Sequence, residues 1–203
     1  MTLEIVPFLL ASIALTISPG PDILFVLTLS VSKGFKQGFL TSLGLVSGII
    51  VHTTLVAFGV SIFIQNTPVV FWIIKIAGAL YLLRLAFLTY QAPATIHLST
   101  SASEQSKGQL FRQGFLMNVL NPKVTLFFLA FLPAFVDLKS NHAVLHFYTL
   151  GGIFMLQALL IFGLVSWFAS KLSATIRSNT SLGWFFKWLQ IVVFVAVAVL
   201  VLV

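Results

Sequence analysis

The sequence of 203 residues contains no cysteine and very few charged residues. Without cysteine there is no disulfide bond, no thiolate metal ligand and no dithiol redox chemistry. Charged residues make up only 7% of the chain, against about 25% in an ordinary soluble domain. A chain with so few charged residues cannot cover the surface of a soluble protein, which excludes a soluble enzyme, a nucleic-acid-binding domain and a disordered tail.

Apolar residues are abundant instead, at 59% of the chain, and the mean hydropathy is +1.10. We therefore expect an all-α integral membrane protein with a single transmembrane domain over residues 1–203. A membrane-spanning helix needs about 20 mostly apolar residues, and six such stretches are present. They are about Leu3–Ser30, Phe39–Ile64, Val69–Tyr90, Phe111–Phe135, Val144–Ser170 and Leu182–Val203.

The few charges are mostly basic, with 11 Lys and Arg against 4 Asp and Glu. In membrane proteins basic residues collect in cytoplasmic loops. The six expected spans place six of the loop charges on one side: Lys33, Lys36, Lys107, Arg112, Lys171 and Arg177. The other side has only Lys139, close to Asp137. This asymmetry predicts that both termini lie outside the cytoplasm.

The two halves of the chain share motifs in the same order. The first and fourth spans are interrupted by Ser18-Pro19-Gly20-Pro21-Asp22 and by Asn121-Pro122-Lys123. The third and sixth spans begin Trp-x-x-Lys, at Trp72 and Trp184. We expect one repeat over about 1–90 and a second over about 111–203, joined by a polar loop over 91–110. Because each repeat has three spans, the second must be inverted relative to the first.

Proline interrupts a helix because it lacks a backbone donor and clashes with the preceding turn. Pro19, Pro21 and Pro122 therefore predict helix breaks at bilayer depth, where the freed backbone groups need protein, water or ligand as partners. A helix that restarts there points its positive end at the gap, which suits a carboxylate. The alternative is a pair of kinks that only shape packing. Paired breaks in inverted repeats are typical of secondary transporters.

Asp22 and Lys123 follow the two breaks and are the strongest candidate site residues. A carboxylate at bilayer depth is costly unless it is paired or faces water. Asp22 could bind a substrate ammonium or carry a proton, or it could only pair with Lys123. Lys123 in turn could hold a substrate carboxylate or only neutralise Asp22. Ser18, Gly20 and Asn121 lie at the breaks, where they either touch ligand or satisfy backbone groups.

Two further polar residues lie within apolar spans. His52 follows Gly44 and Gly48 on one face of the second span, and the glycines favour close helix packing. His52 is either a proton relay or a neutral, hydrogen-bonded histidine, and Gln157 is a candidate ligand contact. His142 and His146 have a spacing that can bind zinc, but their place at the end of a span favours an interfacial role. We expect no metal and no cofactor.

The motifs are similar to those of a known family. Pro19-Gly20-Pro21-Asp22, Gly78-Ala79-Leu80-Tyr81-Leu82, Asn121-Pro122-Lys123 and Pro133-Ala134-Phe135 resemble, in order, signature segments of the LysE/RhtB family of amino-acid exporters. The resemblance implies a transporter rather than an enzyme. It would export amino acids or close derivatives across the inner membrane of a bacterium by proton antiport. Asp22 and His52 are then the candidate proton carriers.

Other functions stay open from the sequence. A cation or metal-ion carrier or channel would need more oxygen or charged ligands than one intramembrane carboxylate provides. A membrane assembly protein without transport activity would not need paired broken helices. The small-residue faces make a homodimer possible.

Overall fold

The computed structural model describes residues 5–18, 20–60, 68–91 and 105–171, together with scattered positions between 184 and 202. All regular structure in this part of the chain is helical, with no strand. This confirms the expected all-helical class. About half of the sixth expected span falls outside the described residues, and its described positions are helical.

Two of the helices are broken where the proline motifs predict. The first span consists of α1 (Ile5–Ile17) and α2 (Pro21–Lys33), which meet at 55°. The fourth span consists of α6 (Lys107–Val119) and α7 (Pro122–Ala130), and α7 runs into a 3₁₀ turn, η2 (Leu132–Phe135). The bend of this second pair is 50°.

The other described helices are continuous. They are α3 (Phe35–Thr54), which continues as a π-helical segment η1 (Leu55–Val60), then α5 (Pro68–Gln91) and α8 (Ala143–Lys171). Within the described residues, Phe35–Gly59 and Ala143–Lys171 are long and apolar enough to cross a membrane, and each bent pair brings one more candidate span. The sequence did not predict the π-helical segment.

The polar loop expected over 91–110 ends earlier than predicted. Helix α6 begins at Lys107 because Ser106 and Gln109 form a capping box. The Gln109 amide donates to Ser106 Oγ at 3.3 Å, and the Ser106 amide donates to Gln109 Oε1 at 2.8 Å. These two bonds satisfy backbone donors at the helix start. The last residues of the predicted loop are therefore helical.

Helix α6 crosses α3 at very close range. A side chain at Gly44 would collide with the backbone carbonyl of Phe111, and one at Gly114 would collide with that of Thr41. The glycines of the second span thus have the packing role that their spacing favoured. The core beside this crossing contains an aromatic cluster in which Phe127 and Phe128 of α7 contact Phe154 of α8.

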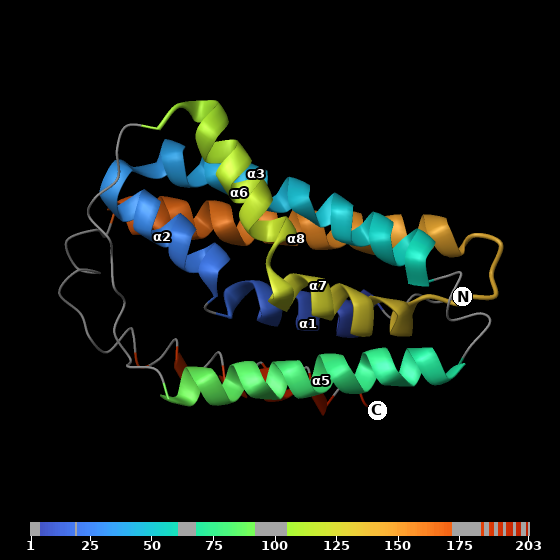
Figure 1. Ribbon diagram of the computed structural model, residues 1–203. Coiled ribbons are helices and arrows are strands. Elements are labelled where there is room, and N and C mark those ends of the chain that lie inside the picture. Colours follow the sequence, from blue (N-terminus) through green and yellow to red (C-terminus); the bar gives the residue numbers. More distant parts are fainter. Residues whose placement is uncertain are drawn as a thin grey trace.

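The arrangement of the helix ends agrees with the charge pattern. Figure 1 shows the end of α2, the start of α3, the start of α6 and the end of α8 towards one end of the bundle, and these ends carry Lys33, Lys36, Lys107 and Lys171. The segment with Asp137 and Lys139 lies at the other end.

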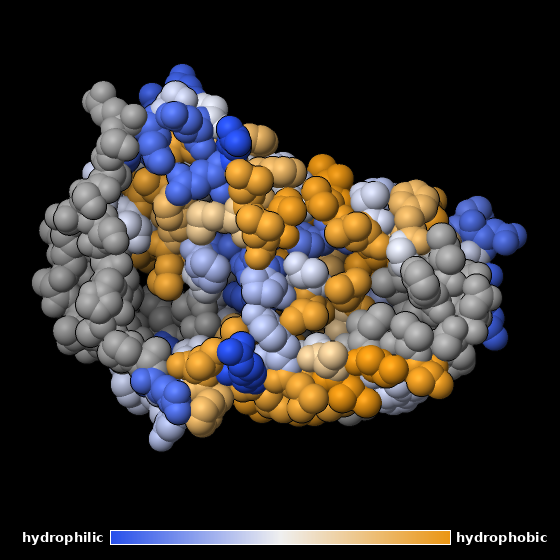
Figure 2. All heavy atoms as spheres, viewed as in Figure 1, coloured by the Kyte–Doolittle hydropathy of each residue, from blue (hydrophilic) through white to orange (hydrophobic). Residues whose placement is uncertain are grey.

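The outer surface is apolar where a bilayer would contact it. Figure 2 shows apolar side chains along α5 and hydrophilic ones gathered around the start of α6. Large apolar side chains such as Leu80, Phe87, Leu156 and Leu160 are about 60% exposed. An exposed apolar surface of this extent suits lipid rather than water.

Candidate functional site

The second half of each broken helix begins on a proline. Pro21 is the first residue of α2, after Gly20, and Pro122 is the first residue of α7, after Asn121. Proline is favoured at this position because the missing N–H would have no partner there and the ring fixes a helical φ. Asp22 and Lys123 consequently occupy equivalent places in the first turns of α2 and α7. Pro19, the remaining proline of the first motif, lies outside the described residues.

Asn121 connects the two breaks. Its side-chain oxygen accepts a hydrogen bond from the Lys123 amide at 3.0 Å and so caps the start of α7. Its side-chain nitrogen donates to Asp22 Oδ1 at 2.8 Å. One amide side chain therefore stabilises the helix restart in the second half and holds the carboxylate of the first half.

Lys123 makes the reverse connection. Its ammonium donates to the backbone carbonyl of Ser18 at 2.8 Å, one of the carbonyls left free where α1 ends. A cation at a helix C-terminus interacts favourably with the helix dipole. A Cβ added to Gly20 would lie 3.2 Å from Lys123 Nζ, so the missing side chain leaves room for the ammonium.

The two charged side chains are both buried. Asp22 is 7% exposed and Lys123 is 6% exposed, and they attract each other electrostatically. Burying either charge alone would be strongly destabilising. The fold thus brings together five of the predicted site residues around a compensated pair of opposite charges: Ser18, Gly20, Asp22, Asn121 and Lys123.

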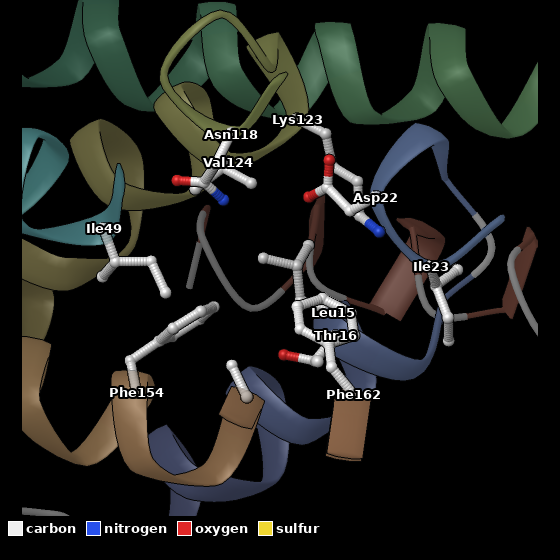
Figure 3. A pocket seen from close by; sticks show the side chains of 11 residues that line it. Leu15, Thr16, Asp22, Ile23, Ile49, Asn118, Lys123, Val124, Phe154 and Phe162 are labelled. Atoms are coloured by element: carbon white, nitrogen blue, oxygen red, sulfur yellow. The ribbon is translucent and has the colours of Figure 1, made fainter. Parts of the chain in front are cut away.

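A small cavity opens between the breaks and the long helices. Figure 3 shows Asp22 and Lys123 on one side of it and Ile49 with Asn118 on the other. Apolar residues make up most of the remaining wall: Leu15, Ile23, Val124, Phe154, Ala158 and Phe162, with Thr16 as a further polar group. The space open to the centre of a water-sized sphere is about 20 Å³, enough for a water molecule. In this conformation the cavity is too small for an amino acid.

His52 and Gln157 do not line the cavity but contact residues that do. His52 is 2% exposed, and its Nε2 donates to the backbone carbonyl of Asn118 at 3.0 Å. Gln157 Nε2 donates to Thr16 Oγ1 at 3.0 Å. The structure therefore places each of the two predicted residues behind a polar residue of the cavity wall.

Asn118 and Thr16 line the cavity and were not predicted. Both are polar residues inside apolar stretches, and Asn118 lies three residues before Asn121, so this signal was present in the sequence. The apolar wall carried no such signal, because Ile49 and Phe154 resemble any other core residue. His142 and His146 belong to no cluster of three potential metal ligands among the described residues.

Paired broken helices joined through a buried Asp and Lys define a multi-pass helical membrane protein of the translocator type. The chain belongs to the LysE type translocator family, whose model matches residues 13–203. This confirms the resemblance seen in the motifs. The characterised relatives are efflux proteins, so the family comprises transporters rather than enzymes.

Two relatives illustrate the similarity. A homoserine/homoserine lactone efflux protein of Salmonella typhi is 34% identical over 129 residues, which cover 64% of this chain and 63% of that protein. A leucine efflux protein of Salmonella choleraesuis (strain SC-B67) is 33% identical over 144 residues, covering 70% and 68%. The first match thus spans less than two thirds of its relative. No solved structure matches the chain.

Proposed function

We propose that the protein exports amino acids or close derivatives from the cytoplasm across the inner membrane of a bacterium, in exchange for protons. The observation that carries this proposal is the connection of the two helix breaks around one cavity through Asp22, Asn121 and Lys123. The names of the relatives, which are efflux proteins for homoserine and leucine, support the substrate class.

The proposed architecture has six spans in two inverted repeats, with both termini outside the cytoplasm. The similar bends of 55° and 50° in the two broken spans support the repeat. The packing supports it as well, because α8 lies against the broken pair α1–α2 and α3 lies against the broken pair α6–α7. The basic helix ends gathered at one end of the bundle support the orientation.

In the proposed mechanism the substrate ammonium pairs with Asp22, and its carboxylate meets Lys123 or a helix N-terminus. The described cavity holds no more than water, so substrate entry requires the two halves to separate. Separation would lengthen the bonds that cross between the breaks, Lys123 to Ser18 and Asn121 to Asp22. The substrate and the antiported proton would then replace the lost partners of the two charges, with Asp22 and His52 as the proton carriers.

Counterflow in proteoliposomes tests this function directly. Vesicles preloaded with one unlabelled amino acid at a time are diluted into a trace of the same labelled amino acid. We expect transient accumulation with homoserine, leucine or a close derivative, and none in protein-free vesicles. An Asp22→Asn, Lys123→Met double variant retains the size of the site without its charges and should show no accumulation. Failure of every amino acid in the panel would contradict the proposal.

A further inference from the structure

Asn118 is a buried polar residue that the mechanism above does not use. It is 3% exposed and lines the cavity across from Asp22 and Lys123. Its side-chain oxygen is fully buried and has no hydrogen-bond partner. A buried amide with a free acceptor is costly in an apolar environment, so this arrangement needs a reason other than stability.

The contact with α3 decides which end of the amide faces the cavity. A Cβ at Gly48 would lie 2.7 Å from Asn118 Oδ1 and 2.9 Å from Asn118 Cβ, so the oxygen is turned against the backbone of α3. The oxygen is enclosed, yet the residue contributes to the cavity wall. The atom left to face the cavity is the side-chain nitrogen, which is a hydrogen-bond donor.

The backbone of Asn118 is held independently of its side chain. Its carbonyl accepts hydrogen bonds from His52 Nε2 at 3.0 Å and from the Asn121 amide at 2.9 Å. These bonds fix the residue at the edge of the break, and Gly48 provides the space in which its amide lies. The contact with His52 thus holds the backbone of Asn118 and leaves its side chain free to face the cavity.

We propose that the Asn118 side-chain nitrogen donates a hydrogen bond to the substrate carboxylate and so selects compounds with a free carboxylate. This proposal rests on the proposed function and names one determinant of its specificity. Lys123 supplies a second, charged donor to the same carboxylate, while Asp22 remains for the ammonium. A substrate whose carboxylate is converted to an amide loses the charge that makes both contacts strong.

The test measures counterflow of labelled L-leucine in proteoliposomes, with competition by unlabelled L-leucine and by L-leucinamide. In the wild type, L-leucine should compete at least about tenfold better than L-leucinamide, because hydrogen bonds to charged groups are the strong ones. Asn118→Ala should weaken competition by L-leucine about tenfold and leave competition by L-leucinamide nearly unchanged. The isosteric Asn118→Asp should reverse the preference, because its carboxylate repels that of leucine.

Two glycine variants separate a binding role from a folding role. Gly48→Ala displaces the Asn118 side chain and should reduce the preference for L-leucine as Asn118→Ala does. Gly152→Ala is the matched control, because no atom lies within 4 Å of its added Cβ, and it should behave as the wild type does. The proposal would be overturned if Asn118→Ala weakened competition by L-leucine and by L-leucinamide equally. It would also be overturned if Asn118→Asp kept the wild-type preference for L-leucine over L-leucinamide. Absence of wild-type counterflow with every amino acid in the panel would instead refute the proposed function.

Discussion

Replacing Asn121 by alanine should destabilise the protein more than any other single change at the breaks that leaves the charges in place. The substitution removes the cap of α7, worth about 0.5–2 kcal/mol. It also removes the 2.8 Å hydrogen bond to the buried Asp22 carboxylate, and hydrogen bonds to charged groups contribute about 1.5–3 kcal/mol. The expected total is roughly 2–5 kcal/mol, since both partners of Asn121 lose a bond inside the protein.

Two companion variants separate the contributions of the two hydrogen bonds to this loss of stability. Asn121→Ser keeps a side-chain oxygen for the Lys123 amide but is too short to reach Asp22, so it should retain the cap and lose only the second bond. Asn121→Ala in an Asp22→Asn background should cost less than in the wild type, because the group left without a donor is no longer charged. The difference between the two backgrounds measures the coupling of the breaks.

Thermal unfolding in detergent, followed by tryptophan fluorescence, is the assay. Each kcal/mol corresponds to roughly 2–4 °C in Tm for a chain of this size, so Asn121→Ala should melt well below the wild type and Asn121→Ser should lie between them. Thr125→Val is a control, because the Thr125 hydroxyl bonds only to a carbonyl within its own helix turn. Equal Tm values for wild type, Asn121→Ser and Asn121→Ala would refute the idea that Asn121 joins the two breaks.

Three more outcomes are expected. Pro122→Ala removes a residue that costs about 3 kcal/mol in a helix interior, so α6 and α7 should fuse into one helix. Membrane insertion should survive while counterflow falls sharply; normal counterflow would show that this break only shapes helix packing. Lys123→Met should lower the free energy of unfolding by about 3–5 kcal/mol because it leaves the buried Asp22 charge without a cationic partner. Adding Asp22→Asn should restore most of the decrease in Tm. A reporter active only outside the cytoplasm should be active at the C-terminus and silent within residues 91–110; the opposite pattern would reverse the proposed orientation.

The sequence predicts the broken helices well because proline acts locally. Pro21 and Pro122 each lack a backbone donor and clash with the preceding helix turn, so the chain alone predicts interruptions between Ile17 and Pro21 and between Val119 and Pro122. Hydropathy likewise predicts the long helices, and α8 begins and ends within one residue of the expected span. The start of α6 was missed because the capping box at Ser106 outweighs the polar composition of its first turn.

The site itself is only partly predictable from the sequence. Asp22 and Lys123 stand out because charge is rare in an apolar chain. Their cross-connection is not visible, because it depends on how α2 and α7 approach each other in space. Asn118 shows this most clearly: its place at the cavity depends on the missing side chain of Gly48, 70 positions earlier in the sequence.

The most direct test of the account is transport driven by a pH gradient in Asp22→Asn. Proteoliposomes with an acidic interior should accumulate labelled L-leucine as protons leave, if the wild type is an antiporter. Because the proposed mechanism uses Asp22 both as a proton carrier and as the partner of the substrate ammonium, Asp22→Asn should lose this accumulation, and exchange of leucine for leucine should vanish with it. Exchange that stays intact in Asp22→Asn would leave Asp22 as a proton carrier only. Gradient-driven accumulation that persists in Asp22→Asn, or that an added Lys123→Met restores, would contradict the proposed role of Asp22 in proton-coupled export.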